Sequence, residues 1–156
     1  MRLVIQRVRS ASVSWPSDEA DEQRREIGQG VVVLVGVAAA DDEGSARRLA
    51  EKVRDLRIFP DAEGRTNLGL GDVNGQALVV SQFTLYADLS RGRRPSFVGA
   101  GDAAHAERLY RAFAEHLAQR GVPVQTGSFG AAMTVRLENQ GPFTLVLSSD
   151  DWNTAV

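Results

Sequence analysis

The amino-acid sequence predicts a single domain of the mixed α/β class (α+β type), with a mostly antiparallel sheet and two main helices. The chain has 156 residues and is 43% hydrophobic, so it is long enough to bury one core and too short for two typical domains. Segments with strand patterns cluster along the chain without regular alternation with helices, and two segments have helical spacing. Clustered strands of this kind favour a mixed, largely antiparallel arrangement.

The N-terminal part predicts two strands separated by a charged segment. Residues 2–8 alternate between two faces, as an extended strand does. Residues 17–26 are almost wholly charged or small, which is typical of a solvated loop. Residues 31–37 are a nearly continuous run of apolar, mostly β-branched side chains. We therefore expect them to form a strand that is buried on both faces and lies centrally in the sheet.

Two helices follow from apolar residues that recur every three or four positions. A helix over residues 43–56, with Asp41 or Asp42 near its start as a cap, is predicted by Ala46, Leu49, Ala50, Val53 and Leu56. A second helix begins near Asp102 and ends at Gly121, with Pro123 shortly beyond. Its apolar face is formed by Ala106, Leu109, Tyr110, Phe113 and Leu117.

Three further strands complete the expected sheet. Residues 77–85 have the composition of a strand, and alternating apolar residues predict strands over 133–137 and 143–147. The last two are joined by residues 139–142.

Composition excludes several classes of chemistry. With no cysteine and only two histidines, the chain has no thiol nucleophile or disulfide, and we expect no metal centre. Gly69, Gly71 and Gly75 lack the spacing of a dinucleotide loop, so no cofactor is expected. Apolar runs are too short to span a membrane, and the N-terminus lacks a signal-peptide core. A soluble, cytoplasmic protein is the expectation.

Two groups of side chains stay open to more than one interpretation. His105 and His116 fall on the second helix without an acidic or serine partner in an obvious triad, which favours a structural role. Arg91, Arg93 and Arg94 form a local basic cluster. The cluster either contacts phosphates or is a solvated loop, because the formal net charge of -2 implies no global attraction to nucleic acid.

Three segments together resemble the D-aminoacyl-tRNA deacylase family. They are Ser81-Gln82-Phe83-Thr84-Leu85, Gly127-Ser128-Phe129-Gly130-Ala131-Ala132-Met133 and Asn139-Gln140-Gly141-Pro142-Phe143-Thr144. The resemblance extends over residues 1–148 and leaves 149–156 as an acidic C-terminal tail. The sequence departs from the family pattern in the charged stretch 17–26, in Phe143 and in this tail.

The resemblance implies a barrel-like sheet, a homodimer and an activity. The activity is hydrolysis of the ester bond of D-aminoacyl-tRNA, with glycyl-tRNA as a further substrate, in the chiral proofreading of translation. No metal or cofactor is implied. The site residues are Ser81, Gln82, Phe83 and Thr84, where the backbone amides of Phe83 and Thr84 polarise the ester carbonyl while the substrate's own 2′-hydroxyl takes part.

The resemblance also implies a chirality filter and a nucleoside pocket. Gly141 and Pro142, joined by a cis peptide bond, reach from one subunit into the other's site and leave no room for an L side chain. Arg7, on a strand face with Leu3 and Ile5, braces this segment. The pocket for the terminal adenosine is lined by Phe129, Gly130, Ala131 and Met133, although Phe129 and Met133 are equally suited to the core.

Two other functions remain alternatives at this stage. Ser81 or Thr84 could act as a covalent nucleophile on an acyl ester, but neither has a nearby base in the sequence. The chain could also be a non-catalytic module that binds the tRNA end. Release of free amino acid from D-tyrosyl-tRNA separates the module from both enzymes.

Overall fold

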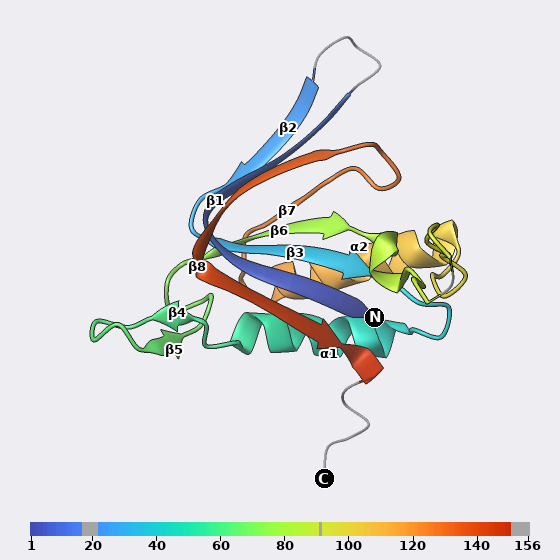
Figure 1. The fold of residues 1–156 in the computed structure, drawn as a ribbon. Coiled ribbons are helices and arrows are strands. Elements are labelled where there is room, and N and C mark those ends of the chain that lie inside the picture. The colour runs from blue at the N-terminus through green and yellow to red at the C-terminus, as the bar shows by residue number, and fades with distance from the viewer. Residues whose placement is uncertain (17–21, 91, 151–156) are drawn as a thin grey trace.

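The fold is a nearly closed, barrel-like sheet with two helices, and a computed structural model describes residues 1–16, 22–90 and 92–150 of it (Figure 1). The main sheet has six strands: β1 (Arg2–Pro16), β2 (Glu22–Ile27), β3 (Gly30–Gly36), β6 (Gln76–Ser81), β7 (Val124–Thr126) and β8 (Thr134–Ser148). The helices are α1 (Glu43–Asp55) and α2 (Ala103–Gln119), with a short 3-10 helix, η1 (Phe83–Tyr86). A separate hairpin pairs β4 (Phe59–Pro60) with β5 (Thr66–Leu68).

Strand β1 organises the sheet because it pairs with three neighbours. Its first half is antiparallel to β3, its second half is antiparallel to β2, and β8 runs antiparallel along both halves. The remaining pairs, β3 with β6 and β6 with β7, are parallel. The predicted class, a mixed and mostly antiparallel barrel-like sheet with two main helices, is confirmed.

The core has two parts that meet at β3. Val31, Val33 and Val35 pack with α1 and α2 in the larger cluster. Val32 belongs to a second cluster inside the curved sheet, where Leu34 packs against it. The prediction of a central strand buried on both faces is therefore confirmed.

Both predicted helices are present, and both begin with an aspartate cap. The Asp42 carboxylate accepts a hydrogen bond from the Ser45 amide at 2.7 Å, and the Asp102 carboxylate accepts one from the His105 amide at 3.1 Å. Gly121 follows α2 with φ +83°, a left-handed conformation that suits glycine at a helix end. None of the helices in the described part of the chain is long and apolar enough to cross a membrane.

Three sequence predictions of local structure are wrong. Residues 22–26 belong to β2 and are not loop, because the edge strand pairs its backbone with β1 while its charged side chains stay exposed. The other predicted loop positions, 17–21, lie outside the described residues. The strand predicted over 77–85 ends at Ser81 and is followed by η1. The two C-terminal strands are one continuous strand, since both halves of β8 pair with β1.

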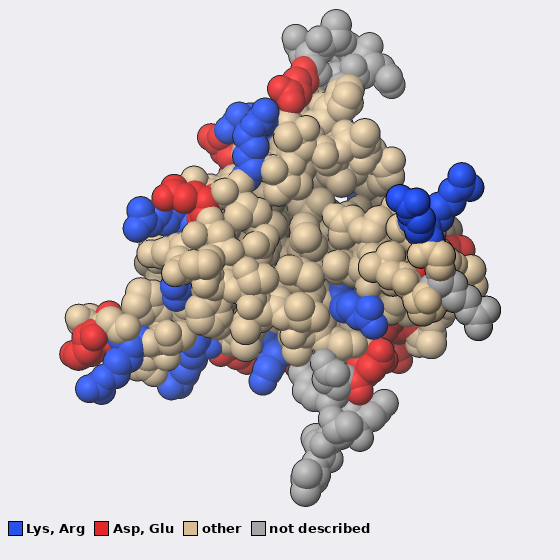
Figure 2. All heavy atoms as spheres, in the orientation of Figure 1, with Lys and Arg blue, Asp and Glu red and all other residues tan. Residues whose placement is uncertain are grey.

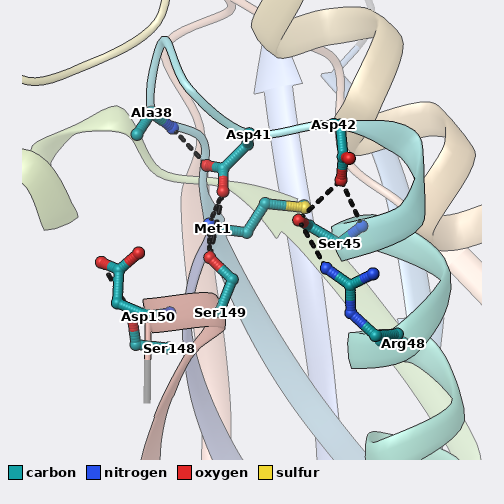
Figure 3. Close-up of polar contacts among 9 residues, drawn as sticks. All are labelled: Met1, Ala38, Asp41, Asp42, Ser45, Arg48, Ser148, Ser149 and Asp150. Atoms are coloured by element: carbon teal, nitrogen blue, oxygen red, sulfur yellow. Dashed lines mark hydrogen bonds and ion pairs between the residues drawn. The ribbon is translucent and has the colours of Figure 1, made fainter. Parts of the chain in front are cut away.

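A polar cluster ties both ends of the described barrel to the loop after β3 (Figure 3). The Met1 ammonium donates hydrogen bonds to the Asp41 carboxylate and to the Ser149 hydroxyl, and the Ser149 amide donates to the Met1 carbonyl at 2.8 Å. Asp41 also accepts from the Ala38 amide at 2.7 Å. The contacts of the barrel thus extend to Ser149, one residue into the predicted tail, whose residues 151–156 lie outside the described part.

Candidate active site

A cavity of about 580 Å³ opens where the carboxyl end of β6 meets η1, the start of α2 and the loop between β7 and β8. Figure 1 shows these segments converging at one end of the sheet. The cavity wall includes most of the predicted catalytic and nucleoside-binding residues: Ser81, Gln82, Phe83, Phe129, Gly130, Ala131 and Met133. Thr84 follows directly in η1 but is not part of the wall. Phe83 and Phe129 therefore line one cavity although they are 46 residues apart in the chain.

The local path of the chain exposes two backbone amides beside this cavity. The Gln82 amide still pairs with the Val35 carbonyl at 2.8 Å, and the chain then turns into η1, with Gln82 as its N-cap. The first amides of a helix have no partner within it. Within the described residues, the amides of Phe83 and Thr84 donate to no other protein group. They are free to bind an oxygen atom of a ligand.

Contacts on both sides hold η1 in place. The Gln82 side-chain amide donates a hydrogen bond to the Thr84 hydroxyl. The Arg2 guanidinium donates to the Leu85 carbonyl at 2.7 Å and lies over the Tyr86 ring, 4.7 Å from its centroid. Desolvation, with the Asp41 charge as the next cause, raises the pKa of Tyr86 to about 12. Tyr86 is therefore neutral at physiological pH, and the guanidinium lies against an uncharged ring.

The cavity wall is almost free of ionisable groups. Among the described residues that line it, Tyr110 alone has a side chain that titrates. Burial raises the pKa of Tyr110 to about 12, and its hydroxyl donates a hydrogen bond to the Val79 carbonyl at 2.9 Å. Tyr110 is thus committed to a structural contact and is no base at neutral pH. The wall offers no base to activate Ser81 or Thr84, which leaves the covalent alternative without the group it needs.

The loop between β7 and β8 forms one side of the cavity and also packs against the core. The Phe129 ring lies 5.9 Å from the Tyr110 ring, centroid to centroid. Met133 packs over Gly127, where a Cβ would come within 2.5 Å of the Met133 sulfur. Phe129 and Met133 thus combine the two roles that the sequence leaves open, since both line the cavity and both pack on core clusters.

Arg7 and the Gly141-Pro142 segment form a second structure on β8. Gln6 pairs with Thr144 and Val8 pairs with Asn139, so residues 140–143 bulge opposite Arg7 alone. The Gly141-Pro142 peptide bond is cis, Gly141 has φ +128°, and both residues are exposed. Figure 1 shows β8 bending sharply between its two halves.

Arg7 supports this bulge from beneath. Only 9% of Arg7 is exposed, and its guanidinium donates to the Gln140 carbonyl at 3.1 Å and to the Ile58 carbonyl. It also lies over the Phe143 ring, 4.9 Å from the centroid. Its guanidinium therefore holds the Gln140 backbone at one end of the bulge and packs on the Phe143 ring at the other. Arg7 is therefore a buried, hydrogen-bonded residue.

The predicted site residues fall into two separate groups within one chain. Among the described residues of the cavity wall, none belongs to the bulge or to Arg7. A single chain thus brings most of the predicted catalytic and nucleoside-binding residues together around one cavity, and it places Gly141, Pro142 and Arg7 apart from them.

Sequence reasoning missed the part of the wall that comes from α2 and the loop before it. Phe97 packs edge-to-face on Phe83, with centroids 4.9 Å apart, and Ala103 and Ala106 line the cavity from α2. The apolar period of α2 predicts Ala106 and Tyr110 as buried but gives no sign that they border a cavity.

Neither histidine lies in the cavity wall of the described chain. His105 Nδ1 lies 3.3 Å from the Arg108 guanidinium, and His116 Nε2 lies 3.9 Å from the Glu43 carboxylate. No group of three or more His, Cys, Asp or Glu residues within the described ranges is arranged to hold a metal ion.

Comparison with known proteins places the fold and the sequence motifs in one family. The model of the family described as D-Tyr-tRNA(Tyr) deacylase matches residues 4–148. The D-aminoacyl-tRNA deacylase of Roseiflexus sp. (strain RS-1) is 53% identical over 149 residues, which are 96% of this chain and 94% of that protein. The protein of the same name from Chloroflexus aurantiacus is 54% identical over 149 residues, with 96% and 91% covered.

A solved structure titled "c-Myc DNA Unwinding Element Binding Protein" has the same fold. It is 34% identical to this chain, covers 95% of it and 98% of its own length, and superposes with a TM-score of 0.86. The match to the family model over residues 4–148, together with relatives above half identity, shows that the chain belongs to the D-Tyr-tRNA(Tyr) deacylase family.

Proposed function

We propose that this protein hydrolyses the ester bond of D-aminoacyl-tRNA to free D-amino acid and tRNA, with glycyl-tRNA as a further substrate. The names of its relatives support the substrate class. The observation that carries the mechanism is a pair of free amides, at Phe83 and Thr84, beside a cavity whose described wall has no side chain that is a base at neutral pH. Such a site favours catalysis by polarisation of the substrate over catalysis by a side-chain nucleophile.

In this mechanism the cavity positions the substrate and the backbone supplies the electrostatics. The terminal adenosine lies against Phe129 and Met133, and the ester carbonyl accepts hydrogen bonds from the Phe83 and Thr84 amides. Water adds to the carbonyl carbon, and negative charge on the carbonyl oxygen is stabilised by the two amides as in an oxyanion hole. The bond to the ribose oxygen then breaks, and that oxygen takes a proton as the amino acid leaves. The neighbouring 2′-hydroxyl of the substrate assists the proton transfers.

Rejection of L-aminoacyl-tRNA requires a second copy of the chain in this proposal. Gly141 and Pro142 are exposed on a bulge that Arg7 supports, and they are absent from the described wall of the chain's own cavity. Val146, 68% exposed, and Leu137, 37% exposed, offer apolar surface on β8 beside the bulge. In a two-fold dimer the backbone carbonyls of the bulge occupy the partner's site where an L side chain would lie. The dimer acts in the cytoplasm, where aminoacyl-tRNA is used.

Thr84→Ala is expected to keep most of the activity. The substitution removes the hydroxyl but retains the amide that is proposed to act, whereas loss of a true nucleophile costs on the order of a millionfold in kcat. The measurement is the rate at which free D-tyrosine is released from D-tyrosyl-tRNA, with Ser81→Ala as the companion variant. Near-complete loss of activity in a folded Thr84→Ala protein, or trapping of an acyl-enzyme on either hydroxyl, would contradict the mechanism.

A further inference from the structure

The chain between η1 and α2 carries an unexplained basic group, in a segment of residues 88–98 that we term the arginine loop. Backbone hydrogen bonds in both directions close the segment: the Asp88 amide donates to the Ser96 carbonyl at 2.7 Å, and the Ser96 amide donates to the Asp88 carbonyl at 3.0 Å. Within it, Arg93 and Arg94 are exposed, whereas Arg91 lies outside the described residues. These bonds hold together the two ends of the segment that carries Arg93 and Arg94.

The arginine loop is part of the same structure as the cavity. Its Phe97 lines the cavity and packs edge-to-face on Phe83, which carries one of the two free amides. Arg94 is three residues from Phe97, so their Cα atoms are at most about 11 Å apart even if the chain between them is fully extended. A nucleic-acid strand that leaves the cavity past Phe97 therefore passes within reach of this loop.

The acidic groups nearest in sequence do not neutralise these arginines. The Asp88 carboxylate accepts a hydrogen bond from the Ser90 amide at 2.9 Å, and the Asp102 carboxylate caps α2. Across the described residues, no carboxylate lies within 4.0 Å of the guanidinium of Arg93 or Arg94. Several other exposed arginines are paired with an acid: Arg9, Arg24, Arg54, Arg111 and Arg120. Arg47 and Arg65 are also exposed and make no ion pair within the described residues, but neither is near the cavity wall in sequence. Position beside the cavity therefore sets Arg93 and Arg94 apart.

The charge distribution makes this loop the basic end of the cavity. Figure 2 shows Lys and Arg side chains gathered at the end of the molecule where Figure 1 places the loop before α2, next to a broad uncharged area. Because the chain has a formal net charge of -2, any attraction to a polyanion must come from a local group of this kind.

We propose that Arg93 and Arg94 bind backbone phosphates of the RNA whose 3′ end occupies the cavity. The inference rests on the proposed function for the identity of the RNA and extends it to the part of the substrate beyond the terminal nucleoside. Phosphates fit these residues because each exposed guanidinium that neutralises a phosphate releases a condensed counterion from the RNA. Contacts of this type fix position and affinity and read no base sequence.

The test compares the double variant Arg93→Ser, Arg94→Ser with a matched control, Arg47→Ser, Arg65→Ser. The control removes the same charge from exposed positions on α1 and between β4 and β5. The affinity for deacylated tRNA and the KM for D-tyrosyl-tRNA are measured over a range of salt concentrations. In the loop variant, the slope of log affinity against log salt should fall by about 1.4 to 2. Its kcat should stay at the wild-type value, and the control should keep the wild-type slope.

A phosphate-free substrate isolates the proposed contact. Hydrolysis of D-tyrosyl-adenosine, which carries the ester and one nucleoside, should be the same in wild type and in the loop variant. Three results would overturn the proposal: a wild-type salt slope in the loop variant, an equal change of slope in the control variant, or a loss of activity by the loop variant on D-tyrosyl-adenosine as large as its loss on D-tyrosyl-tRNA. The proposal would also be overturned if sedimentation showed a dimer for wild type and a monomer for the loop variant, because the loop would then be a contact between copies. If wild type releases no amino acid at all, the proposed function fails, and tRNA binding still tests the loop.

Discussion

Phe83→Pro is expected to slow hydrolysis of D-aminoacyl-tRNA about a hundredfold to a thousandfold more than Phe83→Ala does. Removal of one oxyanion-hole donor in other enzymes has an effect of this size. Both variants lose the ring that packs on Phe97, but only proline also removes the backbone N–H. Phe83 is the first residue of η1, a position where proline fits a helix, and Gln82 before it, with φ -147° and ψ 80°, lies outside the α region that a following proline disfavours. The comparison therefore removes one amide donor with little change of backbone.

Single-turnover rates with D-tyrosyl-tRNA give the comparison, and circular dichroism with thermal unfolding shows whether both variants retain the fold. The difference should appear in kcat more than in KM, because the amide acts on charge that develops in the transition state. Equal rates for the two folded variants would show that the Phe83 amide takes no part in the reaction.

Gly141→Ala is expected to lower the rate of D-aminoacyl-tRNA hydrolysis at least about tenfold while the protein stays folded. An alanine at φ +128° is strained, and its Cβ would lie 3.0 Å from an Arg7 guanidinium nitrogen and 3.1 Å from the Phe143 amide nitrogen. Strain of this kind is about 1–3 kcal/mol, enough to displace the bulge from the place where a substrate α-carbon must pass it. Because Gly141 is exposed, the loss falls on the site more than on the core.

Gly64→Ala is the matched control for this substitution. Gly64 also has a positive φ, +77°, in the hairpin between β4 and β5, but an added Cβ there would meet nothing within 4 Å. Deacylation of D-tyrosyl-tRNA and L-tyrosyl-tRNA by both variants is the measurement. If Gly141→Ala kept the wild-type rates and the wild-type preference for D over L, the bulge would have no role in the mechanism.

The elements that could be predicted from the sequence are those with local causes. Asp42 and Asp102 cap their own helices, and the apolar spacing of each helix marks its buried face. Likewise, the β-branched run of β3 is apolar on both faces because both are buried. In these cases the determining contacts lie within a few residues or depend only on burial.

The elements that were missed depend on distant backbone partners. Strand β2 has five consecutive exposed residues, so its strand character comes from pairing with β1 and leaves no apolar pattern. The composition of Asn139-Gln140-Gly141-Pro142 is that of a turn, yet the segment is a bulge in one strand because β1 pairs on both sides of it. Strand β6 ends where its pairing with β3 ends, at Ser81 opposite Val35, and no local sequence pattern marks this position.

The candidate site divides in the same way. Motif segments supplied Ser81 to Phe83 and Phe129 to Met133, which the structure gathers around one cavity. Phe97, Ala103 and Ala106 reach that cavity only because α2 packs beside β6, and the hydroxyl of Tyr110 on the same helix bonds to a β6 carbonyl. Side chains that reach the cavity through helix packing have the same spacing in the sequence as any buried helix face, so the sequence does not mark them as functional.

Mixed dimers test the central claim, that the bulge of one chain completes the site of the other. Two variants are used, Gly141→Ala for the bulge and Ala106→Trp, which places a large ring in the cavity wall. Chains with different affinity tags are co-expressed, and only mixed dimers are purified. If each chain carries one substitution, the intact cavity meets an intact bulge from its partner, and about half of the wild-type D-tyrosyl-tRNA deacylation should remain, because one of the two symmetric sites is complete. If one chain carries both substitutions and the other none, activity should fall to the level of Gly141→Ala or below. The opposite pattern, with activity retained only when both substitutions share a chain, would contradict the account.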